Sequence, residues 1–501
     1  MLKVNEYEYG KGTYISETAN EIYRLGEIPT DYQEYLKLVQ DHQENQVPRI
    51  QMLNRYYIGH NDGIMYRDRR KDIEKADYRT AHPFAENVTT FRTSYLVGKP
   101  VKTELIGDQY DDLNVWLEDW NMREDADAHN LDLVTDLSKF GRAYELLYRG
   151  QDDQTHIAIS NPEWTFVVYD ETVQQEPLFA IRYPSVLRKG EQLHQITVYL
   201  KDKILSFPPT KVENGKLLDP EVSYHAFNDI PIIEYSANRY RIGDYEKVIP
   251  MIDLYDYAQS DTGNYMTDTN ESLMVVIGDF DPDTVTYDKE ANMMLLPTGE
   301  SSNGQQTSLS AQYIYPQYDV TGTESYKDRL RRDIYLFAYT PDMSDENFAS
   351  NQSGEAMKYK LMGLEQDRAI KERLVRRGMT RRYRLIVELS KSLRELSVDV
   401  DINDLLVTFT PNLPANLSQE LPTLVNAGAK FSQATLLAQA SFVDNVQDEL
   451  EAVEKERDDN INFMRRQMGG VDSNHDQVLE ETPQRGDEGT TGERSRFTRG
   501  L

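Results

Sequence analysis

The sequence predicts a multidomain α+β protein, and three observations support this fold class. The chain has 501 residues, more than one hydrophobic core usually serves. Residues 30–140 carry apolar side chains at helical spacing, whereas residues 142–207 form short β-branched and aromatic runs between turn residues. Helical spacing returns after residue 250, with one β-rich stretch inside it. We therefore expect a mixed α+β domain followed by helical segments.

The composition is strongly acidic, with 55 basic and 85 acidic side chains and a formal net charge of −30. Such a surface repels DNA unless its positive charges are segregated. The chain has no cysteine, which excludes disulfides and thiolate metal sites and fits a reducing, intracellular origin. No apolar run approaches the roughly 20 residues of a membrane helix, so we expect no membrane span. The 33 tyrosines are amphipathic rings of a kind common at subunit contacts.

The mixed domain is expected to start with a polar arm at residues 1–29 and two helices. Thr30 and Gln33 form a capping box that opens a helix to about residue 43. Pro48 lies at the first turn of a second helix, which ends near residue 59. We expect the basic stretch that follows to be a solvated loop; it contains Arg67, Arg69, Arg70, Lys71 and Lys75.

Three more helices and six strands complete the mixed domain, which extends to about residue 240. Residues 83–97 place apolar side chains on one helical face and end at a glycine–proline stop. Two further helices fit residues 111–120 and 126–140. The strands are short runs separated by turn dipeptides, at residues 142–148, 156–160, 165–169, 178–183, 195–200 and 203–207.

Two helices enclose a β-rich insert in the next part of the chain. Pro250 starts a helix to about residue 269, and helical spacing recurs at residues 323–339. Turn-rich sequence between them surrounds short β runs at residues 273–277, 293–296 and 312–315. Helices that flank an insert most simply run antiparallel, so we expect a two-helix stalk with the insert at its tip.

A polar loop, residues 341–352, follows the second of these helices. Pro341 ends that helix, because the residue before a proline is pushed out of the α region. Ser353 is a good N-cap for the next helix, and Glu355 lies in its first turn, where the helix dipole favours an anion. The loop is neither apolar nor glycine-rich, which suits a loop displayed for a function. Spacing alone favours an ordinary corner between two helices.

The helix after the loop can run without a proline from residue 355 to 396, and it concentrates positive charge. Residues 365–394 contain ten basic and four acidic side chains, a net +6 that leaves −36 for the rest. Four arginines fall on one face: Arg373, Arg377, Arg381 and Arg384. An apolar stripe is expected on another face, from Ile370, Leu374, Leu385, Leu389, Leu393 and Leu396. The arginine face is either solvated or ion-paired to the acidic part of the protein, which the pattern favours, or a contact for nucleic acid.

The chain after this helix is expected to end in more helices and a tail. Residues 405–410 read as a strand, and two prolines at residues 411–414 mark a boundary. Residues 418–468 have helical spacing, with a capping box near residue 444. From residue 469 too few large apolar side chains remain to build a core, so we expect disorder.

No catalytic, nucleotide or metal motif stands out, so the sequence predicts neither an enzyme nor a cofactor. The chain lacks the phosphate-loop pattern GxxxxGK[ST], the dinucleotide pattern GxGxxG, and the hydrolase and metalloprotease patterns GxSxG and HExxH. The eight histidines include no pair at i and i+4. Asp281 and Asp283 form a D-x-D pattern, which is weak evidence for a metal site in so acidic a chain.

Six short segments, all within residues 50 to 460, occur in a recognisable order. They are Tyr95-Leu-Val-Gly-Lys-Pro-Val101, Asn161-Pro-Glu-Trp-Thr-Phe-Val-Val-Tyr-Asp170, Leu178-Phe-Ala-Ile-Arg-Tyr183, Val248-Ile-Pro-Met-Ile-Asp-Leu-Tyr-Asp256, Asn351-Gln-Ser-Gly-Glu-Ala-Met357 and Phe442-Val-Asp-Asn-Val-Gln-Asp-Glu-Leu450. In this order they resemble the portal proteins of tailed bacteriophages, in the family typified by the portal of phage SPP1. The resemblance implies a ring of about twelve subunits (twelve or thirteen) at one capsid vertex, with double-stranded DNA packaged and ejected through its centre.

The resemblance also implies how such a fold divides: a mixed α/β wing, a helical stem, a small β clip and a helical crown. The corresponding residues are 1–240 for the wing with its arm, 241–272 and 322–340 for the stem helices, 273–321 for the clip, 341–352 for a tunnel loop, 353–415 for the long helix and a return strand to the wing, 416–468 for the crown and 469–501 for the tail.

The implied tunnel loop would face DNA at the narrowest point of the channel. Its residues are Asp342, Met343, Ser344, Asp345, Glu346, Asn347, Phe348, Ser350 and Asn351. Acidic walls repel phosphates and prevent tight binding that would stall the DNA. The four arginines of the long helix stay open between contacts to DNA and contacts to a neighbouring subunit.

The implied partners are the terminase large subunit, the major capsid and scaffolding proteins and a head-completion adaptor, with no membrane, cofactor or metal. The implied location is the virion, at the portal vertex, and the host cytoplasm during assembly. Two rival readings are a DNA-packaging or DNA-processing enzyme, which needs a catalytic motif, and a head-assembly protein that never contacts DNA.

Overall fold

The computed structural model divides the chain into two units, Met1–Leu413 and Pro414–Leu501. In the first unit it describes residues 22–71, 75–270, 273–278, 286–288, 293–297, 310–314, 319–343, 361–396 and 400–412. In the second unit it describes residues 450, 453, 455 and 457, which are helical. The predictions for residues 1–21 and for the tail after residue 469 lie outside the described residues, as does almost all of the helical stretch expected at 418–468.

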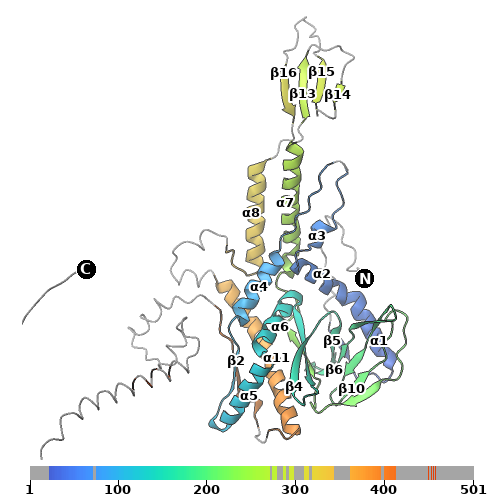
Figure 1. Cartoon of the computed structure of the whole chain (residues 1–501), viewed down its shortest axis with the longest axis vertical. Helices are drawn as coiled ribbons and strands as arrows, with labels where there is room; N and C mark the ends of the chain where they lie inside the picture. Colours follow the sequence, from blue (N-terminus) through green and yellow to red (C-terminus); the bar gives the residue numbers. More distant parts are fainter. Residues whose placement is uncertain are drawn as a thin grey trace, which may run out of the picture. The chain divides into compact units, whose positions relative to one another are not determined.

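Residues 30–140, which were predicted to be mainly helical, are mainly helical in the structure (Figure 1). They are α1 (Tyr32–Asp41), α2 (Val47–Tyr57), α3 (Asp62–Met65), α4 (Phe84–Val97), α5 (Asp111–Arg123) and α6 (Ala126–Phe140). The N-cap of α1 is Asp31 rather than Thr30, because the Asp31 carboxylate accepts from the backbone N–H of Gln33 at 2.9 Å. A π-helical turn, His42–Gln46, joins α1 directly to α2.

A six-stranded sheet and a three-stranded sheet follow, with strand orders β1-β5-β6-β9-β10-β11 and β12-β3-β4. Their strands are β1 (Tyr23–Leu25), β3 (Arg142–Arg149), β4 (Thr155–Ser160), β5 (Thr165–Asp170), β6 (Pro177–Arg182), β9 (Thr197–Tyr199), β10 (Lys203–Ser206), β11 (Glu221–Tyr224) and β12 (Ile232–Ser236). A separate hairpin is formed by β7 (Ser185–Arg188) and β8 (Glu191–His194). The six predicted strands are confirmed, whereas β1, β7, β8, β11 and β12 were not predicted.

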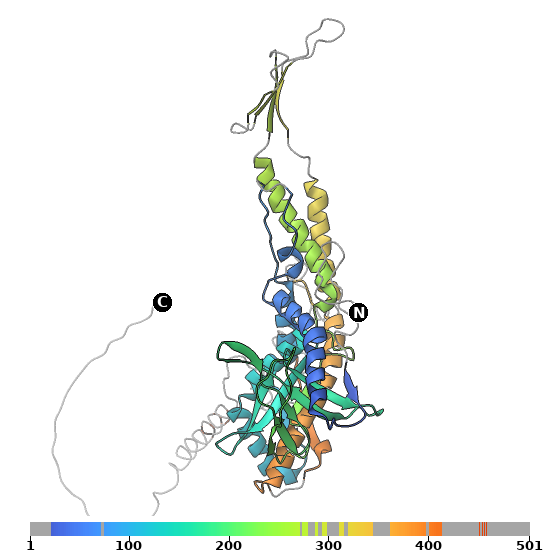
Figure 2. The same ribbon diagram turned by 90° about the vertical axis from the view of Figure 1, so that its right-hand side faces the viewer.

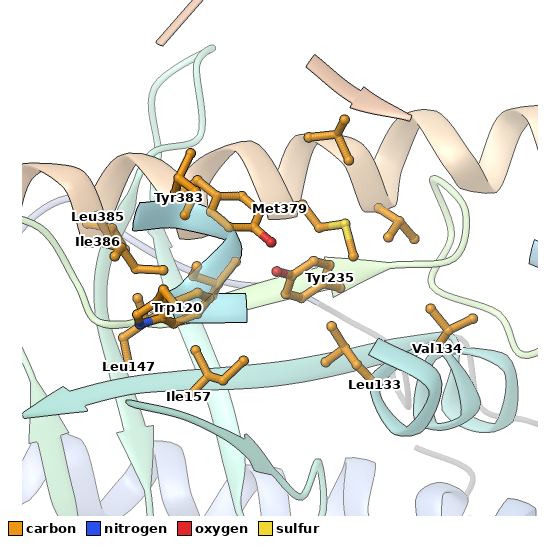
Figure 3. Packing of buried hydrophobic residues seen from close by; sticks show 14 of the residues in the cluster. Trp120, Leu133, Val134, Leu147, Ile157, Tyr235, Met379, Tyr383, Leu385 and Ile386 are labelled. Atoms are coloured by element: carbon orange, nitrogen blue, oxygen red, sulfur yellow. The ribbon is translucent and has the colours of Figure 1, made fainter. Parts of the chain in front are cut away.

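The long helix α11 (Met362–Ser392) packs into the main hydrophobic core, against the three-stranded sheet and α5. Figure 3 shows Met379 and Tyr383 of this helix close to Tyr235 of β12 and Trp120 of α5. The strand β17 (Leu405–Thr408) returns to the same core and pairs antiparallel with β2 (Lys102–Leu105).

The apolar stripe predicted on this helix is partly wrong. Leu385 and Leu389 are buried, but Ile370 is 56% exposed and Leu393 is 42% exposed. The buried face is instead centred on residues 375–386, because that middle part of the helix meets the sheet and α5.

Helices α7 (Ile249–Asn270) and α8 (Val320–Phe337) lie side by side and antiparallel in both views (Figures 1 and 2). The Nζ of Lys327 in α8 donates to Oε1 of Gln259 in α7 at 3.0 Å. A four-stranded sheet of order β14-β15-β13-β16 connects the end of one helix to the start of the other. Its strands are β13 (Leu273–Gly278), β14 (Thr286–Asp288), β15 (Met293–Pro297) and β16 (Ser310–Ile314). The prediction of two antiparallel helices around a β-rich insert is therefore confirmed.

A second core fastens this helix pair to the helices of the mixed domain. Ile252 of α7 and Ile334 of α8 are fully buried there, together with Leu53 of α2 and Val88 of α4. Burying a side chain of this size contributes about 1.5–3 kcal/mol. Apolar packing therefore holds the start of α7 and the end of α8 in place.

Candidate functional site

The end of α8, where the polar loop begins, is anchored to buried charged groups. Arg92 of α4 is 6% exposed, and its Nη1 donates to the carbonyl oxygen of Ala338 at 2.8 Å. This contact satisfies one of the carbonyls that a helix leaves unpaired at its C-terminus. The same arginine pairs with Asp244 at 3.3 Å and with Asp367 of α11. One guanidinium therefore ties the end of α8 to the start of the long helix.

The described part of the predicted tunnel loop is Pro341, Asp342 and Met343. The Asp342 carboxylate lies 3.2 Å from Nε of Arg331 in α8, and its side chain is 12% exposed. Its charge is therefore largely neutralised within its own chain. Met343 is 64% exposed. The other predicted loop residues lie outside the described residues: Ser344, Asp345, Glu346, Asn347, Phe348, Ser350 and Asn351.

The basic stretch predicted to be a solvated loop is a strap along α7, and that prediction is partly wrong: Arg69, Lys71 and Lys75 are exposed, but Arg67 and Arg70 are not. We use "the strap" for residues 67–71 and 75–82. The backbone N–H groups of Tyr78, Thr80 and His82 donate to side chains of α7 at 2.8, 2.9 and 3.0 Å. The acceptors recur every fourth residue along the helix and are Asn264, Ser260 and Asp256.

Ion pairs hold the more basic part of the strap. Arg70 contacts the Asp268 carboxylate at 2.7 Å, and Arg67 contacts the Asp261 carboxylate at 2.8 Å. Burial raises the pKa of Asp256, while hydrogen bonds from His82 and Asn61 oppose that shift. The sequence signal for this contact was a polar stripe along α7, formed by Asp256, Ser260, Asn264 and Asp268. A helix buries such a stripe only against other polar groups.

The four arginines predicted to share one face of α11 do so, with unequal surroundings. Arg373 and Arg377 are exposed. The Nη2 atoms of Arg381 and Arg384 lie 3.1 and 2.9 Å from the same Oδ2 of Asp229. Burial lowers the pKa of Arg381, and the Asp229 carboxylate opposes this shift. The expected solvated or ion-paired face thus holds two ion-paired arginines, Arg381 and Arg384, and two exposed ones.

A groove of about 640 Å³ runs beside this face. We call it the arginine groove. Its lining combines four cations, three carboxylates and four neutral residues: Lys201, Arg377, Arg381, Arg384, Glu176, Asp229, Glu388, Pro177, Asn228, Thr380 and Ile402. Within the described ranges, neither Arg377 nor Lys201 forms an ion pair, so the groove carries unneutralised positive charge.

Sequence reasoning missed a fully buried ion pair on the opposite side of α11. Arg382 Nη2 lies 2.6 Å from Oε1 of Glu145 in β3, and both side chains are 0% exposed. Tyr235 donates to the same carboxylate at 2.8 Å, and His129 Nε2 lies 2.7 Å from it. Burial alone would raise the pKa of Glu145, but Arg382 and His129 lower it to about 2. The sequence signal that could have revealed this pair was Glu145, an acidic residue inside an apolar strand.

The described part of the chain offers no cluster of three or more histidine, aspartate or glutamate side chains arranged to hold a metal ion. Among the same residues, no helix is both long and apolar enough to cross a bilayer.

Comparison with known proteins places these features in a family. Residues 36–462 match the family model described as phage portal protein, SPP1 Gp6-like. The portal protein of Bacillus phage SPP1 is 24% identical over 455 residues, which cover 84% of this chain and 85% of that protein. The portal protein of Clostridium phage phiCD119 is 24% identical over 416 residues, covering 78% of this chain and 89% of that one.

Two solved structures also align with the chain at low identity. One is the neck of an empty gene transfer agent particle, with a TM-score of 0.37, 12% identity and coverage of 74% of this chain and 89% of that chain. The other is the virion of a native gene transfer agent particle, with a TM-score of 0.39, 11% identity and coverage of 77% and 91%. The family match spans most of the chain, and with it the resemblance inferred from six short segments is confirmed. The chain belongs to the SPP1 Gp6-like phage portal proteins, a structural family whose members form oligomeric rings at the capsid vertex of the virion.

Proposed function

We propose that this chain forms a ring of about twelve copies through which double-stranded DNA enters and leaves the capsid. The observation that carries the proposal is the family match over residues 36–462, which spans the α7–α8 pair, its β-sheet and the loop after Pro341. In this proposal residues 1–240 form the wing, α7 and α8 the stem, and β13–β16 the clip. The crown corresponds to residues 416–468.

The loop from residue 341 to 352 lines the narrowest part of the channel in this proposal. Asp345 and Glu346 supply charge that repels DNA, while Met343 and Phe348 give weak contacts along which the backbone can slide. Asp342 takes little part in this repulsion, because Arg331 neutralises it within the same chain. The anchoring of Ala338 by Arg92 supports the proposal, since a constriction needs a loop whose starting point is fixed.

The partners in this proposal are those of a DNA conduit. The terminase large subunit docks on the clip during packaging and a head-completion adaptor replaces it afterwards. The major capsid and scaffolding proteins surround the wing while the ring assembles in the host cytoplasm. The chain itself supplies no chemistry, and the motor hydrolyses the nucleotide.

Ring formation is tested first. The purified chain should form closed rings with a central hole in end-on electron micrographs, without ATPase activity. A monodisperse monomer in light scattering at physiological salt, or a closed shell in the micrographs, would refute the proposal.

Channel lining is tested next with the double variant Asp345→Lys, Glu346→Lys. The variant adds two cations per subunit, about two dozen around the ring. Each phosphate that a cation neutralises contributes about −0.9 to the slope of the logarithm of the DNA-binding constant against the logarithm of the salt concentration. We expect rings that assemble but package DNA poorly, with the defect relieved by raised salt. Normal packaging, or failure to form rings, would show that the loop is an ordinary corner.

A further inference from the structure

The arginine groove carries a charge that its own chain does not balance. Arg381 and Arg384 share the carboxylate of Asp229, and Nε of Arg384 also lies 3.9 Å from Oε1 of Glu388. Nε of each arginine has no hydrogen-bond acceptor within the described part of the chain. Arg377 and Lys201 are exposed and unpaired among the same residues. A guanidinium without a carboxylate partner favours a second acceptor, because charge-assisted hydrogen bonds are about twice as strong as neutral ones.

The exposed face of α5 has the complementary composition. Asp111, Val115, Glu118 and Met122 recur at i, i+4, i+7 and i+11 and therefore share one face. Val115 is 60% exposed and Met122 is 67% exposed, an arrangement that leaves apolar surface between carboxylates. Asp112 and Asp119 add further exposed charge. The groove offers cations together with the apolar side chains of Pro177 and Ile402.

The two faces point away from each other within one copy. The buried face of α5, with Leu117 and Trp120, packs in the main core, and Trp120 lies 6.1 Å from Tyr383 of α11, measured between ring centroids. Helical spacing places Arg377 and Arg384 on the side of α11 opposite Met379 and Tyr383. Figure 3 shows these last two side chains entering the core. The core therefore separates the arginine groove from the acidic face. One copy cannot satisfy its own groove, but a neighbour in a ring can.

We propose that the arginine groove of each copy binds the acidic face of α5 of the next copy, with Glu118 or Asp119 entering beside Arg377. This proposal rests on the proposed ring, in which each head-to-tail contact joins two different patches. The carboxylates of Glu176 and Glu388 in the groove lining oppose a long polyphosphate, whereas a single carboxylate fits between the cations. Protein rather than DNA is thus the favoured ligand.

A charge swap tests the contact. The double variant Arg377→Glu, Lys201→Glu should raise the subunit concentration needed for half-maximal ring assembly by about tenfold or more, measured by analytical ultracentrifugation at physiological salt. Adding Glu118→Lys and Asp119→Lys to the same chain should restore assembly toward the wild-type concentration. The control Arg188→Glu, Lys189→Glu changes net charge equally in the exposed β7–β8 hairpin and should leave assembly unchanged.

The outcomes of these experiments distinguish the proposed subunit contact from its alternatives. Unchanged assembly of the groove variant, or loss that the α5 swap does not relieve, would overturn the proposal. Normal assembly with weaker retention of a short DNA duplex would identify phosphate as the ligand and also overturn it. If the wild-type chain forms no rings at all, the proposed function itself fails.

A cross-link provides a second measurement that does not depend on charge. Because the chain contains no cysteine, Thr380→Cys with Asp119→Cys introduces one thiol in each face. Oxidation of assembled rings should give a ladder of covalent multimers, whereas either single variant gives none beyond a dimer. Folded rings of the double variant that yield no ladder would contradict the contact.

Discussion

The ion pair between Arg382 and Glu145 is the contact by which the structure most directly fixes α11 to its sheet. Both side chains are 0% exposed, and the carboxylate accepts hydrogen bonds from Nε of Arg382 and from the Tyr235 hydroxyl, with Nη2 of Arg382 2.6 Å from its Oε1. Arg382→Met keeps much of the side-chain volume but leaves the carboxylate buried beside the His129 ring and the Tyr235 hydroxyl. Removing one partner of a buried pair costs about 3–5 kcal/mol. We expect the free energy of unfolding to fall by about that amount.

The measurement is urea unfolding followed by tryptophan fluorescence, since Trp120 lies in the same core. Wild type and variant are compared at one subunit concentration, because assembly itself stabilises the folded chain. Arg373→Met is the matched control: it removes an exposed arginine from the same helix, and a surface change of this kind is usually within about 0.5 kcal/mol.

The pH dependence separates the ion pair from simple packing. The folded-state pKa of Glu145 is about 2, below its ordinary value of 4.5, because Arg382 and His129 outweigh the effect of burial. The stability that the pair contributes is therefore complete above pH 4.5 and is lost as the pH falls toward 2. In Arg382→Met, burial raises the pKa of the carboxyl group, so the variant is protonated earlier and its deficit shrinks at low pH. A loss below about 1 kcal/mol, or a deficit that stays constant with pH, would refute the reasoning.

Three further outcomes test the strap, the end of α8 and the tail. Ser260→Ala removes the acceptor of the Thr80 amide, so hydrogen exchange at Thr80 should quicken by about tenfold; unchanged exchange would mean that the strap is held elsewhere. Arg92→Met removes a charged donor from the end of α8 and should lower the free energy of unfolding by about 2–3 kcal/mol in urea denaturation, whereas a neutral result would contradict the anchoring. Truncation after Gly470 should leave rings intact in electron micrographs, because little apolar sequence lies beyond it, and loss of assembly would show that the tail packs on a neighbour.

Locally encoded elements were predictable because their signals are near neighbours in sequence. The helix α6 has the bounds expected from its apolar spacing and its Gly141 stop, and Gly141 adopts a φ of 77° that favours glycine. The strands β3 to β6 and the helices α7 and α8 followed from period and punctuation in the same way. The missed strand β12 carries an apolar pattern too, but its pairing with β3 spans about ninety residues of sequence. Pairing at such a distance leaves no local signal.

The candidate site was likewise only partly predictable from the sequence. Charge segregation on α11 was visible in the sequence, yet which arginines are neutralised depends on Asp229, about 150 residues away in the chain. The strap carried a basic composition that reads as solvated, and only its position beside α7 shows that Arg67 and Arg70 have carboxylate partners. Composition reports the number of charges, whereas their energies depend on distance and burial.

Local spacing and ordered short segments were enough to predict the fold class, the main helices, the strands β3 to β6 and the family. The tertiary structure decided the pairing of β17 with β2, the buried pair of Arg382 and Glu145, and the orientation of the arginine groove away from the acidic face of α5. These features join residues that are far apart in the chain, and their free energies arise only when folding removes the water between them.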